Sequence, residues 1–160
     1  MRKKSAWNFI NANRRKKIYR LSDMKKKVTQ EHSMGCAVAC VAARCNITYK
    51  NALNFFPQKE NAWMRGYYCY EVVAALSSLG FNYTFVEFDP LKHKNFLQIP
   101  GSIVFIKACV EYPAGHYLLC TKNGWMNPWA NFPNMFPPKS AVQKKFLGKV
   151  AYLIYELEAY

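Results

Sequence analysis

Residues 30–45 read Gln-Glu-His-Ser-Met-Gly-Cys-Ala-Val-Ala-Cys-Val-Ala-Ala-Arg-Cys. The small apolar side chains from Cys36 to about Arg44 are typical of a helix that is buried on most sides. Gly35 directly precedes Cys36, which places this cysteine in the first turn of the helix. Unpaired backbone N–H groups and the helix dipole favour a thiolate there, and the thiolate is the reactive form of cysteine. The sequence therefore predicts a potential nucleophile at Cys36.

Two further helices are expected downstream of this stretch. Thr48 has the side chain of a helix N-cap, and the apolar residues that follow it stop before Pro57. From Tyr70 to Leu79 the apolar residues recur with a helical period, and Gly80 is placed to end that helix. The first half of the chain is therefore predicted to be helical.

After this point the pattern changes to that of β-strands. Strands are expected over the ranges 81–86, 102–107, 116–121, 125–127 and 149–157. Asn123 and Gly124 form a strong signal for a tight hairpin turn, and residues 128–138, rich in Pro, Asn and aromatic side chains, are expected to be a loop. Helices first and an antiparallel sheet afterwards predict an α+β fold.

Length and charge indicate one domain with a basic extension. The chain has 160 residues, of which 51% are hydrophobic, and this suits a single packed core. Residues 1–27 carry eleven Lys or Arg and one acidic residue, so we expect a basic arm there and a folded domain at 28–160. Such an arm can contact nucleic acid or another anionic surface. No apolar run has the length of a signal peptide or of a membrane span, and we therefore expect a cytoplasmic protein.

The cysteines are expected to be reduced. All of them lie within apolar runs, as core thiols do: Cys36, Cys40, Cys45, Cys69, Cys109 and Cys120. A zinc site is an alternative, because His32, Cys36 and Cys40 are spaced four residues apart and could share one helix face. Ser33 and Gly35 argue that the helix begins after His32, so we expect neither a metal nor a cofactor.

A base and an orienting group can be placed near Cys36. His116 opens an apolar strand directly after Gly115, whereas His93 lies in a polar surface stretch. Asn127 follows His116 by eleven residues and stands in the paired strand of the hairpin. This is the arrangement that a Cys–His–Asn triad needs. Gln30 stands six residues before Cys36, where its amide can donate to a developing oxyanion beside the Cys36 N–H.

The order of these residues resembles a known family. The residues that carry the resemblance are Gln30, Cys36, His116, Asn127 and Pro128. They are similar to the small papain-like cysteine peptidases, most closely the bacteriocin-processing peptidases that cleave leader peptides after double glycine. Cys36 and His116 are 80 residues apart, as the family pattern requires. The resemblance covers roughly residues 28–130 and implies a papain-like fold, cysteine peptidase activity and no cofactor.

Aromatic residues from two loops are expected to line the substrate cleft: Trp63, Tyr67, Tyr68, Trp125 and Trp129. An apolar cleft favours a peptide or protein substrate with hydrophobic side chains. Weaker candidates for the orienting amide are Asn13, Asn123, Asn131 and Asn134. Deamidation and acyl transfer use the same triad and stay open. So does a nucleic-acid- or anionic-surface-binding module in which Cys36 is an inert buried cysteine.

Overall fold

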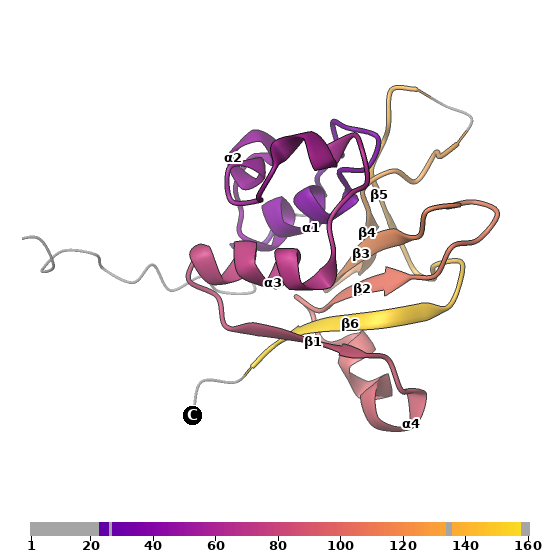
Figure 1. Cartoon of the computed structure of the whole chain (residues 1–160). Helices are drawn as coiled ribbons and strands as arrows, with labels where there is room; N and C mark the ends of the chain where they lie inside the picture. Colours follow the sequence, from indigo (N-terminus) through magenta and orange to yellow (C-terminus); the bar gives the residue numbers. More distant parts are fainter. Residues whose placement is uncertain (1–22, 26, 134–135, 158–160) are drawn as a thin grey trace, which may run out of the picture.

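A computed structural model describes residues 23–25, 27–133 and 136–157, and it shows helices packed on an antiparallel sheet (Figure 1). The helix expected from the small apolar stretch is α1, Cys36–Arg44, and every one of its residues is buried. α2, Tyr49–Leu53, and α3, Cys69–Ser78, both contact α1. The side chain of Thr48 accepts a hydrogen bond from the Asn51 N–H, which confirms the expected N-cap of α2.

The sheet has six strands in the order β1-β6-β2-β3-β4-β5, and each neighbouring pair is antiparallel. The strands are β1 Tyr83–Glu87, β2 Ile103–Ile106, β3 His116–Thr121, β4 Gly124–Asn127, β5 Ala141–Gln143 and β6 Val150–Glu156. The hairpin turn between β3 and β4 is formed by Lys122 and Asn123, one residue earlier than the expected Asn123-Gly124, and Gly124 already pairs with Thr121. The last strand, β6, pairs with both β1 and β2 and thereby joins the two halves of the sheet.

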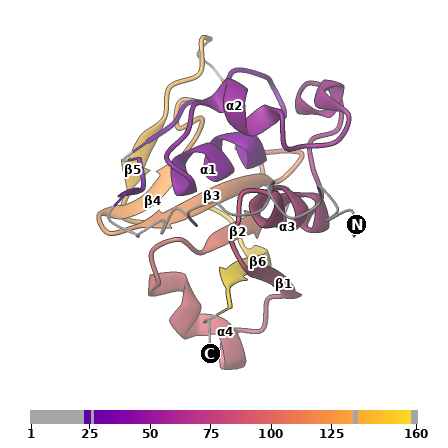
Figure 2. The same ribbon diagram turned by 90° about the vertical axis from the view of Figure 1, so that its left-hand side faces the viewer.

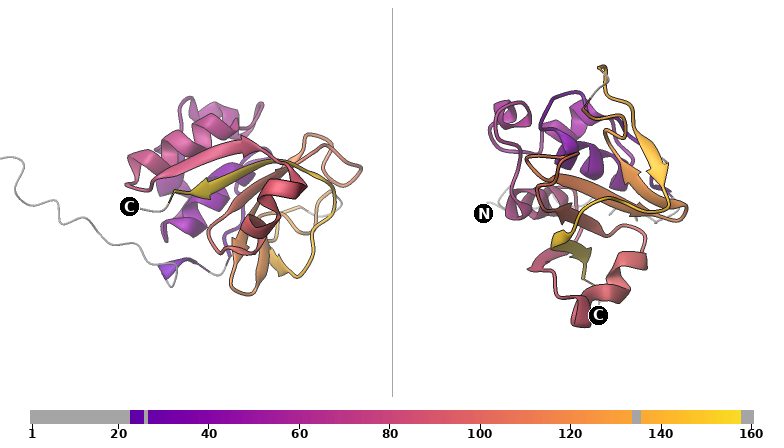
Figure 3. Two further views of the ribbon diagram at one scale, coloured as in Figure 1. Left: turned by 90° about the horizontal axis from the view of Figure 1, so that it is seen from below. Right: turned by 90° about the vertical axis from the view of Figure 1, so that its right-hand side faces the viewer.

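Both faces of the sheet are covered. Successive side chains of a strand point to opposite faces, so Leu119 packs in the helical core while Leu118 packs on the other side. α1 packs against β3 and α3 against β1 on the first face, and α2 packs on α1. The short helix α4, Pro90–His93, and the 3-10 turn η4, Lys94–Gln98, lie on the second face (Figures 2 and 3). α1 and β3, which carry Cys36 and His116, are therefore held together by the main core.

The sequence prediction missed the shortest elements. It did not contain the 3-10 turn η3, Lys59–Ala62, nor α4, η4 and β5. These segments have no clear apolar period of their own, and β5 has its form because it pairs with β4. Because α4 follows β1, the helices are not confined to the N-terminal half as expected. The start of β1 lies at Tyr83 rather than at residue 81.

The end of the predicted basic arm contacts the domain. The Lys25 N–H donates to the Ala43 carbonyl over 3.0 Å, and Met24 packs against the helical core. Residues 1–22 and 26, which form most of that arm, lie outside the described residues. Among the helices that the structure describes, none combines the length and the apolar character needed to cross a membrane.

Candidate active site

Cys36 is the first residue of α1 and is almost covered, with 9% of its surface exposed. Gly35 before it is required by packing, because a Cβ at that position would overlap the Tyr49 hydroxyl. That hydroxyl is in turn hydrogen-bonded to His32 Nδ1 over 3.1 Å. Tyr49 of α2 therefore lies so close to the backbone before α1 that only glycine fits directly before Cys36.

His116 is the first residue of β3 and is also preceded by a required glycine. Gly115 has φ of 76°, in the left-handed region, and a Cβ there would overlap the Phe105 ring. α1 packs against β3, and the backbone of Tyr117, the next residue of β3, lowers the pKa of the Cys36 thiol. The start of β3 is therefore packed directly against the start of α1.

Asn127, at the end of β4, accepts two hydrogen bonds through its Oδ1. One comes from His116 Nε2 over 2.8 Å and the other from the Trp129 N–H over 3.0 Å. Its Nδ2 donates to the Tyr112 hydroxyl over 2.8 Å and to Gln143 Oε1 over 3.1 Å. Because Oδ1 can only accept, His116 Nε2 must carry the proton of the neutral imidazole. The other ring nitrogen, Nδ1, is left free to accept a proton.

Gln30, Cys36 and His116 line one cavity of about 190 Å³. The amide of Gln30 is buried, and its Nε2 donates to the carbonyl oxygens of His32 over 2.9 Å and Ser33 over 3.1 Å. Its Oε1 is buried without a hydrogen-bond partner. The structure thus places the predicted Gln30, Cys36 and His116 at the same cavity. The Gln30 N–H groups, however, are hydrogen-bonded to backbone carbonyls that precede Cys36 in the chain.

Burial determines the charge state of Cys36 and His116. It raises the pKa of the Cys36 thiol to about 11, against a smaller lowering by the Tyr117 N–H. It also lowers the pKa of His116 to about 4, although the hydrogen bond to Asn127 acts in the opposite direction. Both groups are therefore uncharged at neutral pH in the free protein. This corrects the expectation of a stabilised thiolate, because loss of hydration outweighs the stabilisation available at a helix start.

A larger cavity of about 340 Å³ adjoins the first one at the thiol. Met34, Cys36, Ala114 and Gly115 line both cavities. The rest of the larger cavity is mainly aromatic and apolar, with the lining residues Tyr67, Tyr68, Cys69, Tyr70, Phe85, Phe105, Tyr117 and Tyr152 beside Arg65 and Gly66. A polypeptide bound across the Cys36 thiol would therefore contact a mainly apolar surface.

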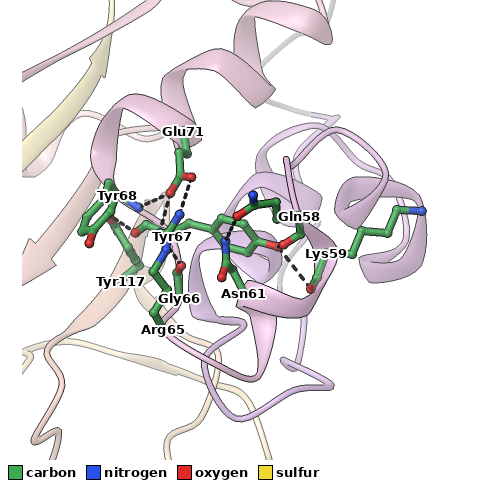
Figure 4. Close-up of polar contacts among 9 residues, drawn as sticks. All are labelled: Gln58, Lys59, Asn61, Arg65, Gly66, Tyr67, Tyr68, Glu71 and Tyr117. Atoms are coloured by element: carbon green, nitrogen blue, oxygen red, sulfur yellow. Dashed lines mark hydrogen bonds and ion pairs between the residues drawn. The ribbon is translucent and has the colours of Figure 1, made fainter.

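The loop before α3 forms one wall of this larger cavity and is held by polar contacts (Figure 4). Arg65 binds Glu71 through two hydrogen bonds of 2.9 and 2.8 Å. Glu71 also accepts from the Tyr68 N–H over 2.7 Å, which satisfies a free N–H at the start of α3. The Tyr117 hydroxyl donates to the Tyr67 carbonyl over 2.9 Å and ties the loop to β3.

The five aromatic residues expected in the cleft are distributed differently. Tyr67 and Tyr68 line the larger cavity, and Trp129 lines the smaller one. Trp63 and Trp125 are not among the residues that line these two cavities. Trp63 is 51% exposed, and the Trp125 ring packs edge-to-face on Phe146 on the second face of the sheet, 4.9 Å between centroids.

The structure adds two residues that the sequence analysis missed, Tyr112 and Gln143, which both bind the Asn127 amide. Tyr112 stands four residues before His116 within a turn-rich stretch, and a lone aromatic in such a loop was the available signal. No signal in the sequence indicated Gln143, because strand β5 was not expected. Of the other amides proposed for orienting His116, Asn131 bonds its own loop and Asn123 lies at the hairpin turn, while Asn13 and Asn134 lie outside the described residues.

All six cysteines are free thiols. Within the part of the chain that the structure describes, no three His, Cys, Asp or Glu side chains come together as metal ligands. His32 lies before the first residue of α1, and it therefore does not share a helix face with Cys36 and Cys40.

No family model and no curated protein matches this sequence. Among solved structures, the peptidase domain of Streptococcus ComA, a bifunctional ABC transporter involved in a quorum-sensing pathway, is similar to it. The likeness has a TM-score of 0.54 at 17% identity and covers 81% of this chain and 96% of that domain. At this identity the likeness is one of fold. It confirms, for the fold, the resemblance to a peptidase domain and the mixed architecture of helices on an antiparallel sheet.

Proposed function

We propose that this chain is a papain-like cysteine peptidase in which Cys36 is the nucleophile. The observation that carries the proposal is that His116, whose Nε2 donates a hydrogen bond to Asn127, lines the same cavity as Cys36. This bond leaves Nδ1 of His116 as the nitrogen that can take the thiol proton. The peptidase domain with the same fold supports amide hydrolysis as the reaction.

The resting pair is neutral, so proton transfer accompanies attack. Nδ1 of His116 takes the Cys36 proton as the sulfur forms a bond to the substrate carbonyl carbon. The resulting imidazolium gives this proton to the leaving amine as the C–N bond breaks, which leaves a thioester on Cys36. Water then attacks the thioester, with His116 again acting as base, and restores the thiol. Asn127 stabilises the transient imidazolium and holds its ring throughout.

Gln30 and the Cys36 N–H are the proposed oxyanion donors. The Cys36 N–H belongs to the first turn of α1, where backbone N–H groups have no acceptor within the helix. Gln30 lines the same cavity, but its amide must give up one of its two bonds, to His32 or Ser33, before it donates to an oxyanion. We therefore expect the Gln30 amide to rearrange when substrate binds.

The proposed substrate is a polypeptide with a bulky apolar side chain near the scissile bond. The larger cavity adjoins Cys36 and is lined mainly by aromatic rings. Its volume of about 340 Å³ accommodates such a side chain. Binding is favoured because transfer of the apolar side chain from water into the cavity lowers the free energy.

A peptide library read by mass spectrometry tests the proposal. Wild type and a Cys40→Ala variant, which loses a thiol one turn further along α1, should both produce cleavage products. Cys36→Ala should produce none. Fragments that persist with Cys36→Ala would refute the proposal, and mass changes without chain cleavage would assign deamidation or acyl transfer instead. For a cleaved peptide, kcat/KM should rise as the pH increases through about 4, because His116 must be neutral to accept the proton.

A further inference from the structure

Tyr112 contacts both His116 and Asn127: its ring stacks on the imidazole, and its hydroxyl hydrogen-bonds the Asn127 amide. Its ring lies parallel to the His116 ring, with 4.1 Å between centroids and an interplanar angle of 3°. Phe132 stacks on Tyr112 at 5.3 Å and 22°. Tyr112 is 8% exposed and His116 is 4% exposed, so water has little access to the faces on which these two rings stack. The stack therefore defines the plane in which the imidazole is held.

The Tyr112 hydroxyl also decides which way the Asn127 amide points. It has one proton, which it donates to the Trp129 carbonyl over 2.9 Å. It must therefore accept from Asn127, and only the Nδ2 end of the amide can donate to it. Oδ1 is thereby turned towards His116, and the Trp129 N–H supports the same orientation from the other side.

We propose that Tyr112 is a positioning residue for the reaction: its hydroxyl orients Asn127, and Asn127 in turn selects the reactive tautomer of His116. The inference rests on the proposed function for its effect on catalysis, while the tautomer itself can be observed without a substrate. If the amide were reversed, Nδ2 would face His116 Nε2, and the imidazole proton would move to Nδ1. That nitrogen could then no longer accept the proton of Cys36.

The backbone of Tyr112 is fixed independently of its hydroxyl. Its carbonyl accepts from the Cys109 N–H over 3.1 Å and from the Gly115 N–H over 2.9 Å, which closes the loop that leads to His116. A Tyr112→Phe variant retains these bonds and the ring stack. It loses one of the two acceptors for Asn127 Nδ2, the other being Gln143 Oε1, and the donor for the Trp129 carbonyl, so it is expected to fold.

The tautomer of His116 can be read by nitrogen-15 NMR of the free protein, whose two ring nitrogens give distinct signals when one is protonated. In wild type, Nε2 should carry the proton. In Tyr112→Phe a second population with the proton on Nδ1 should appear. The matched control is Tyr155→Phe, which changes a tyrosine that packs on Phe96 on the second face of the sheet. A Tyr112→Phe spectrum with the wild-type tautomer alone would overturn the proposal, whether or not a cleaved peptide has been found.

With a cleaved peptide, Tyr112→Phe should lower kcat about 10- to 100-fold and leave KM nearly unchanged, a smaller loss than the roughly 10⁴-fold loss that a wrong triad tautomer causes. The same change in an Asn127→Asp background should cost much less, because a carboxylate presents an oxygen to His116 in either orientation. An equal loss of kcat in both backgrounds would refute amide orientation as the role of the hydroxyl. Failure of wild type to cleave any peptide would count against the proposed function only, since the tautomer populations decide the role of Tyr112 separately.

Discussion

Burial of the neutral His116 ring should make the stability of this protein depend on pH in mildly acidic solution. Its pKa is lowered to about 4 from the usual 6.5, chiefly by burial. Between these values the unfolded chain binds a proton that the native protein does not, so stability present above about pH 6.5 is lost as the pH falls towards 4. One pH unit corresponds to about 1.4 kcal/mol, which gives a loss of about 2 kcal/mol at pH 5 and about 3 kcal/mol at pH 4.

Urea unfolding followed by tryptophan fluorescence measures this loss. Wild type should be compared with His116→Gln at about pH 7.5 and about pH 5, because the other titrating groups then contribute equally to both proteins. The free energy of unfolding of wild type relative to the variant should fall by about 2 kcal/mol between the two conditions. A difference that is the same at both pH values would show that the imidazole is not held neutral by burial.

Four further substitutions test the packing of the fold and of the cavity wall. Gly115→Ala, at φ of 76° and against an aromatic ring, should cost about 3 kcal/mol of stability, whereas Gly80→Ala, at φ of 91° in open space, should cost about 1 kcal/mol in the same urea assay. Tyr83→Phe removes the acceptor of the buried Arg44 Nε and should cost about 2 kcal/mol, and an unchanged urea midpoint would argue against that hydrogen bond. Glu71→Gln weakens the support of the cavity wall before α3 and should raise KM of a cleaved peptide severalfold with a smaller change in kcat; an unchanged KM would separate this wall from substrate binding.

The local pattern of the chain was sufficient for the main elements. The helix at Cys36–Arg44 and the strand at His116–Thr121 have the bounds that the sequence predicted, because a run of small apolar residues and a run of β-formers each persist over a full period. The Asn-Gly pair also predicted the hairpin, although its turn residues are Lys122 and Asn123, one position earlier. These elements were enough to bring the end of β4 beside the start of β3, where Asn127 bonds His116.

Contacts between distant parts of the chain decided the rest. β5 exists because Ala141–Gln143 pairs with β4, and so Gln143 reaches Asn127 without any signal in its own neighbourhood. Tyr112 has its role only because the tertiary structure places its ring on that of His116. The sequence alone determined which chemical groups stand at the starts of α1 and β3. Their protonation states depend on how much water the surrounding core removes, and that follows only from the tertiary packing.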